Sequence, residues 1–200
     1  MQWRRKLIWC GSVVLAVGLL FADNLWGYYR FKTVCAAQGG MHGNQLLERD
    51  AGWMVREGHV ASVRYPLSFE AVKFVRYRNE QDGLTYDVYR QEKHTVTDPG
   101  YVETAANLNE PVFYEHRFRL EDVPNELRLR SSSHEVIDLR TSEVIASYRT
   151  FLFSQFEQSR TLLAAPSLVH CPDDTLRIDP KTGKNMPGLM DQAFASLFKK

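Results

Sequence analysis

The sequence lacks the short motifs that are typical of several enzyme classes. It contains no G-x-S-x-G segment, which excludes the nucleophile elbow of α/β-hydrolases. Its only glycine-rich stretch, QGGMHGN, is not followed by the Lys-Ser or Lys-Thr of a phosphate-binding loop. No two of its six histidines are spaced as H-x-H or H-E-x-x-H, the spacings of common zinc sites. These absences favour a protein that is not an enzyme, and they predict no cofactor and no metal.

The chain also lacks an excess of charge of either sign. Its 200 residues include 25 Lys and Arg against 24 Asp and Glu, so no overall field would attract nucleic acid, and no nucleic-acid partner is predicted. Low-complexity runs and internal repeats are absent as well. A chain of this length and composition is sufficient for one folded domain with a hydrophobic core.

The one long apolar run lies at the beginning of the chain. Residues 7–22 carry no charge, and about 20 helical residues cross a hydrocarbon core of roughly 30 Å. The run therefore predicts a transmembrane anchor over 7–27. Two alternatives stay open. One is a signal peptide cleaved near Ala22, for which Leu20 is a poor residue at the minus-three position, and the other is a helix buried in a soluble core.

The residues that flank this run predict its orientation. A basic cluster precedes it, and polar residues followed by aromatic residues lie at its far end, as is typical of an outer membrane interface: Arg4, Arg5 and Lys6, then Asp23, Asn24, Trp26, Tyr28 and Tyr29. We therefore expect a single-pass inner-membrane protein with a cytoplasmic stub (1–6), the anchor (7–27), a helical neck and connection (28–58) and a periplasmic α+β domain (59–200). Signal cleavage would instead give a secreted or periplasmic protein.

Cysteine is scarce, and its positions are informative. Cys10 lies inside the apolar run, whereas Cys35 and Cys171 lie in the part that would be exported. In an oxidising compartment such a pair most simply forms a disulfide, here between Cys35 and Cys171. Two independent buried thiols are the alternative.

The exported part shows the alternation of a β-sheet rather than the periodicity of a helical bundle. Segments 71–78 and 84–90 flank Asp82-Gly83, which predicts a β-hairpin, and the polar stretch 91–110 reads as a long loop. Alternation over 112–120 predicts another strand, and the two apolar runs on either side of 140–142 predict a second hairpin.

The last apolar positions recur at helical spacing after Pro187, which predicts a closing amphipathic helix. The predicted fold class is thus α+β, dominated by an antiparallel sheet, with a single N-terminal transmembrane helix before it and a C-terminal amphipathic helix. The predicted core between sheet and helix consists of Val112, Tyr114, Phe118, Leu127, Leu129, Val144, Tyr148 and Leu152.

Arginines on the predicted strands are the only candidates for a ligand site. They could bind an anion, together with a histidine on the apolar face of its strand, and the candidate residues are Arg76, Arg78, Arg117, Arg119 and His116. The alternative is that these arginines form cross-strand ion pairs on a solvated face. It is the simpler interpretation, because acidic residues outnumber basic ones between 59 and 154. A hydrogen-bonded core histidine is likewise the simpler interpretation of His116.

Three features of the sequence together support a resemblance. They are YYRFKTVC just after the apolar run, a meander ending in VIDLRTSEVIASYRTFLF, and a second cysteine followed by a terminal helix. In these the chain resembles a group of small uncharacterised bacterial envelope proteins. The resemblance implies an inner-membrane setting and no particular chemistry. The leading hypothesis is therefore a membrane-anchored periplasmic protein that binds another envelope protein, as an accessory subunit or an immunity-type protein. The alternative is a periplasmic domain that binds a small or anionic envelope ligand on the arginine-bearing sheet face.

Overall fold

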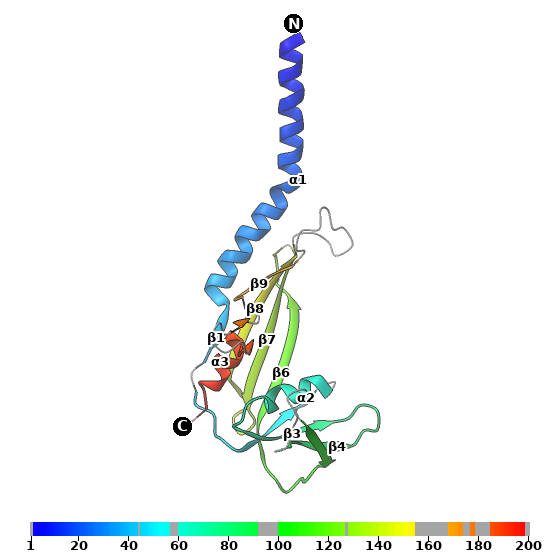
Figure 1. Ribbon diagram of the computed structural model, residues 1–200, viewed down its shortest axis with the longest axis vertical. Helices are drawn as coiled ribbons and strands as arrows, with labels where there is room; N and C mark the ends of the chain where they lie inside the picture. The colour runs from blue at the N-terminus through cyan, green and yellow to red at the C-terminus, as the bar shows by residue number, and fades with distance from the viewer. Residues whose placement is uncertain are drawn as a thin grey trace. The chain divides into compact units, whose positions relative to one another are not determined.

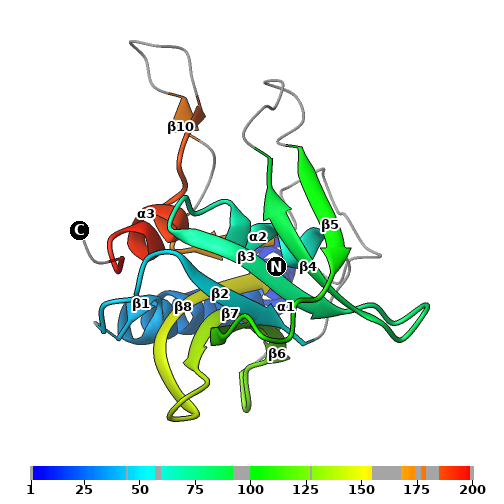
Figure 2. The same ribbon diagram turned by 90° about the horizontal axis from the view of Figure 1, so that it is seen from below.

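The computed structural model describes residues 2–43, 45–56, 60–91, 100–126, 128–154, 168–173, 177–178 and 185–198. The chain forms two compact units. Unit 1 comprises residues 1–39, 121–131 and 150–172, and unit 2 comprises residues 40–120, 132–149 and 173–200. Most elements of the two units are labelled in Figures 1 and 2.

Unit 1 is built on the long helix α1 (Gln2–Gln38), which ends directly before Gly39, where the sequence predicts a helix stop. Strand β9 (Leu168–Cys171) pairs antiparallel with β8 (Glu143–Ser154), and unit 1 also contains the adjoining ends of β6 (Val112–Asp122) and β7 (Leu129–Asp138). The described residues of unit 1 form a core whose buried members are Phe31, Cys35, Leu129, Phe151 and Phe153.

A disulfide joins α1 to β9 within unit 1. The Cys35 and Cys171 Cα atoms are 6.0 Å apart, within the range that a disulfide requires, and the two residues are separated by 136 positions in the sequence. The predicted pairing is therefore confirmed.

Over the residues that the structure describes, no helix has both the length and the apolar character needed to cross a membrane.

Unit 2 contains the remaining elements. In chain order these are β1 (Gly40–His42), β2 (Ala51–Val55), α2 (Val60–Leu67), β3 (Val72–Arg78), β4 (Thr85–Arg90), β5 (Tyr101–Ala105), β10 (Arg177–Ile178), β11 (Asn185–Met186) and α3 (Leu189–Ala195). Strands β10 and β11 pair with each other. The short helix α3 lies in the predicted C-terminal helical segment, and its Phe194 is buried in the main core.

The sheet is mixed rather than antiparallel throughout, which corrects part of the predicted fold class. Its strand order is β1-β8-β7-β6-β2-β3-β4-β5, and β2 runs parallel to both β3 and β6. The chain between β2 and β3 contains α2, the kind of crossover that a parallel connection needs. The central position of β2 explains its nearly continuous apolar sequence, AGWMV. Both β1 and β2 come from the segment 28–58.

The predicted hairpin over 71–90 is confirmed, but the long loop after it is wrong in part. Strands β3 and β4 pair antiparallel, and Gly83 adopts a φ of 71° in their turn. Strand β5 lies inside the predicted loop 91–110 and pairs with β4. As an edge strand with mostly exposed side chains it lacks the alternation of polar and apolar residues from which a strand is recognised.

The predicted second hairpin also exists. Strands β7 and β8 are neighbours in the sheet, and the Ser142 backbone N–H donates to the Asp138 carbonyl at 2.7 Å across their turn. The buried side chains of β8 belong to different cores at the two ends of the strand. Ala146 and Tyr148 belong to the core of unit 2, whereas Phe151 and Phe153 belong to that of unit 1.

The predicted core is right for three residues and wrong for two. Tyr114, Leu129 and Tyr148 are buried, and Val112 and Leu152 are partly buried. Phe118 and Val144 are exposed instead, because β6 is covered only as far as Arg117 and β8 becomes buried only from Ile145. Leu127 lies outside the described residues.

These burial differences predict unequal effects of truncating two phenylalanines. Phe118 is 49% exposed, so its replacement by alanine should lower the free energy of unfolding by about 1 kcal/mol or less. Phe74 is fully buried on β3, and Phe74→Ala should cost about 3 to 5 kcal/mol. Urea titration of both variants tests this, and equal losses would contradict the burial assigned to β6.

Candidate functional site

Arg76 is the centre of a buried polar network on β3. Its guanidinium donates to both carboxylate oxygens of Asp87, from Nε to Oδ1 at 2.7 Å and from Nη2 to Oδ2 at 2.9 Å. It also donates to the backbone carbonyls of Asn107 at 2.6 Å and Glu110 at 3.2 Å. The Asn107 N–H in turn donates to Asp87 Oδ2 at 2.9 Å. Arg76 therefore ties the connection between β5 and β6 to the strand pair β3–β4.

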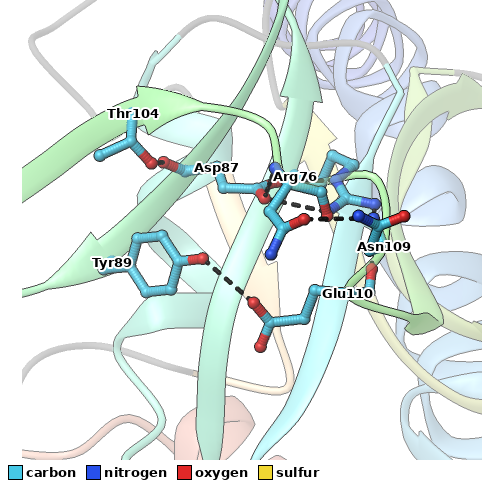
Figure 3. A network of polar contacts seen from close by, with 7 residues as sticks. Arg76, Asp87, Tyr89, Thr104, Asn109 and Glu110 are labelled. Atoms are coloured by element: carbon cyan, nitrogen blue, oxygen red, sulfur yellow. Dashed lines mark hydrogen bonds and ion pairs between the residues drawn. The ribbon is translucent and has the colours of Figure 1, made fainter.

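A second set of contacts surrounds this ion pair (Figure 3). The Tyr89 hydroxyl donates to Glu110 Oε2 at 3.4 Å. Lys73 forms an ion pair with the same carboxylate. The Thr104 hydroxyl donates to the Asp87 carbonyl at 3.4 Å. Because these partners come from β3, β4, β5 and the following loop, the network is a structural connection, and the guanidinium of Arg76 is occupied by the chain itself.

The other candidate arginines contact different partners. Arg117 Nη2 lies 2.7 Å from Glu115 Oε1, and Arg119 Nε lies 3.5 Å from Glu135 Oε2. Arg78 donates to the Gly83 carbonyl at 3.2 Å at the far end of β3. Arg76 and Arg119 form the cross-strand ion pairs that the sequence suggests, whereas Arg117 pairs with a carboxylate on its own strand, β6.

Arg78 lines a shallow hollow of about 290 Å³ with Arg56, whose Nε lies 2.7 Å from Glu115 Oε2. Arg56 is therefore in an ion pair, and it shares the Glu115 carboxylate with Arg117, which donates to the other oxygen. The hollow is not the cluster of unpaired arginines that an anion site on this face would require.

His116 belongs to a histidine pair in the core of unit 2. Its Nε2 is 3.1 Å from Nδ1 of His134, and the Tyr65 ring lies 5.1 Å from one imidazole and 5.0 Å from the other, between ring centroids. His116 is 4% exposed, and burial lowers its pKa to about 3, with the neighbouring His134 adding to the shift. His116 is therefore neutral at physiological pH, as expected of a hydrogen-bonded core histidine.

This buried histidine should make the protein sensitive to mild acid. The unfolded chain binds a proton near pH 6.5 and the folded chain only near pH 3, so the free energy of unfolding should fall by up to about 1.4 kcal/mol per pH unit below 6.5. In His116→Phe this component should disappear, whereas His42→Phe, at an exposed position, should keep it. Urea titrations at pH 7 and 5.5 measure the difference, and an unchanged pH dependence in His116→Phe would refute the assignment.

Tyr65 links the histidine pair to a groove in unit 2. Its hydroxyl donates to Asp191 Oδ1 at 3.5 Å, and Asp191 lies in the first turn of α3. The groove beside α3 has a volume of about 640 Å³, and its lining residues are Arg49, Ser68, Phe69, Glu70, Ala71, Pro187, Gly188, Asp191, Gln192, Ala195 and Phe198. This size lies within the range typical of binding sites.

The groove combines an apolar floor with a charged rim. Phe69, Ala71 and Phe198 are buried members of the main core, so their surfaces supply the floor. Arg49 and Glu70 are exposed, and neither has an ion-pair partner among the residues that the structure describes. An apolar surface with uncompensated charges of both signs beside it is suited to a polypeptide segment rather than to a simple anion.

Sequence reasoning missed this groove because its parts are far apart in the chain. They come from the connection before β2, from the turn between α2 and β3, and from α3 with residues on both sides of it. The only available signal was the amphipathic terminal helix. In the described part of the chain, no three His, Cys, Asp or Glu side chains are arranged to hold a metal ion.

Comparisons with known proteins add no family assignment. No family model matches this sequence, and neither the curated proteins nor the solved structures gave a significant match.

Proposed function

We propose that this protein is held in the inner membrane by residues 7–27, carries its sheet-based domain in the periplasm, and binds another envelope protein there without catalysing a reaction. The groove along α3 is the observation that carries the binding part of this proposal. There an apolar surface lies beside Arg49 and Glu70, for which the described part of the chain contains no ion-pair partner.

The sequence and α1 support the anchoring part. Residues 7–22 carry no charge, and α1 runs through them as one helix. Beyond this segment the exposed side chains include Leu25, Trp26 and Tyr29, and aromatic rings at such a position are typical of a membrane interface. The basic cluster at residues 4–6 favours a cytoplasmic amino terminus.

The disulfide supports export. Structural disulfides persist in oxidising compartments such as the bacterial periplasm, and the Cys35–Cys171 bond lies entirely after the proposed anchor. The same bond joins the part of α1 that follows the proposed anchor to β9, so it crosslinks two segments of unit 1.

Fusions to a reporter enzyme that is active only outside the cytoplasm test the topology. Fusion after Lys200 should give an active reporter, and fusion before Met1 an inactive one, because the basic cluster keeps the amino terminus inside. Terminal sequencing of the mature chain provides the control. A mature chain that begins near Asp23 would show a cleaved signal peptide in place of an anchor.

Blocking the groove tests the binding site. Ala195 is exposed on α3 and lines the groove, so Ala195→Trp should fill part of it and abolish the complex that crosslinking captures in the envelope. The matched control is Ala105→Trp, at an exposed position of the edge strand β5, and it should leave that complex intact.

Two outcomes would count against the proposal. Capture of the same complex by both tryptophan variants would place binding elsewhere on the surface. Absence of any crosslinked complex with the unaltered protein would remove the binding function itself.

A further inference from the structure

The turn between β6 and β7 lies beside α1 in unit 1, and we infer that it forms a second contact with the lipid surface, next to the anchor. This inference rests on the proposed anchoring of residues 7–27. Its occupant is the headgroup layer of the bilayer.

One face of α1 packs on the rest of unit 1 over several helical turns. Asn24, Gly27, Phe31 and Cys35 recur at intervals of three or four residues, which places them on the same side of the helix. Gly27 and Phe31 are buried, the Phe31 and Phe153 rings stack at 5.8 Å, and Cys35 bonds to Cys171. At 1.5 Å per residue this packed face is roughly 16 Å long.

The β6–β7 turn meets the end of this face that is nearer the anchor. Arg128 Nη1 donates to Asn24 Oδ1 at 2.7 Å. One helical turn and a half further along, Arg30 Nε donates to Glu126 Oε1 at 3.0 Å, and its Nη2 contacts the same oxygen. Charge-assisted bonds of this kind fix the turn against α1.

The contact with Asn24 sets the height of the turn. Asn24 lies at the outer end of the proposed span, two residues before Trp26, so the side chain of Arg128 reaches the level at which interfacial aromatic residues lie. Pro124 and Asn125, at the tip of the turn, are exposed. The turn is therefore fixed beside the part of α1 that follows the proposed span, between the levels of Asn24 and Arg30.

The charges around the turn indicate which lipids it contacts. Segments 23–32 and 121–130 together carry four acidic and four basic residues. Two of the basic residues form ion pairs there, Arg30 with Glu126 and Arg130 with Asp122, the latter at 3.0 Å. Because the two segments together carry no net charge, the turn should contact the headgroup layer whether or not the membrane contains anionic lipid.

Photo-crosslinking of the full chain in lipid vesicles tests this contact. A diazirine amino acid is placed at Leu15 in the anchor, at Pro124 in the turn, or at Ala36 on the exposed side of α1, near its end. The vesicles contain phosphatidylethanolamine either with phosphatidylglycerol or with phosphatidylcholine, and lipid adducts are detected by mass spectrometry. We expect adducts at Leu15 and Pro124 in both mixtures, and none at Ala36.

The outcomes separate this inference from the anchor. Adducts at Leu15 without adducts at Pro124 would overturn the turn contact and leave the anchor standing, whereas absence of adducts at Leu15 would overturn both. Adducts at Ala36 as well would show that no fixed height exists. Arg128→Asn suits the positive φ of 58° at this position, shortens the side chain, and should remove most of the Pro124 adduct while leaving that at Leu15 unchanged.

Discussion

Replacing Cys35 and Cys171 together with alanine should lower the free energy of unfolding by up to about 5 kcal/mol. The bond joins residues 136 positions apart, so its removal releases a long loop in the unfolded chain. Among the residues that the structure describes, the buried core of unit 1 has five members, and Cys35 is one of them. Few other contacts in that core could compensate for the loss.

Urea titration of the double variant against the oxidised wild type measures this effect. Cys10→Ala is the control, because Cys10 lies inside the proposed anchor and has no role in the bond. Addition of a reductant to the wild type should reproduce the loss without any change of sequence. Equal stability of the oxidised and double-alanine proteins would contradict the stabilising role assigned to the disulfide.

Replacing Asp87 with alanine should cost about 3 to 5 kcal/mol, because the guanidinium of Arg76 would be left buried without its counter-charge. Asp87 is 0% exposed and Arg76 8%. The change would also remove the hydrogen bond that the Asn107 N–H donates to Asp87. The connection between β5 and β6 would then be held less firmly. The loss should appear in urea titration as a lower midpoint.

Lys73→Ala is the matched control for this prediction. Lys73 lies on the same strand and also forms an ion pair with a carboxylate, but its side chain is 52% exposed, so its loss should cost less than about 1 kcal/mol. The double variant Arg76→Met with Asp87→Leu should recover part of the stability, because it leaves no unpaired buried charge. Equal losses for Asp87→Ala and Lys73→Ala would contradict the buried role of the network.

Local sequence patterns were enough to predict several parts of this protein. The hairpin β3–β4 follows from two alternating runs and an Asp-Gly turn, since neighbouring residues alone determine that geometry. The end of α1 at Gln38 follows from the two glycines after it. The disulfide follows from elimination, because only two cysteines lie beyond the apolar run. Each of these depends on residues close in sequence or on a choice with one simple solution.

Tertiary structure decided the rest. The parallel strand β2 lies between β3 and β6, and no property of AGWMV alone distinguishes that position from an antiparallel one. Arg76 and Arg78 look alike in the sequence, yet one is buried against Asp87 and the other exposed, because only the packing of β4 and the loop before β6 separates them.

The same reason applies to β8 and to the groove. Alternation shows that β8 has two faces, but which face is covered changes along the strand with the elements that pack on it. The groove brings together Arg49, Glu70 and Asp191 from segments up to about 140 residues apart. Burial and proximity of that kind depend on which distant segments pack together. Local patterns of polar and apolar residues do not determine that packing.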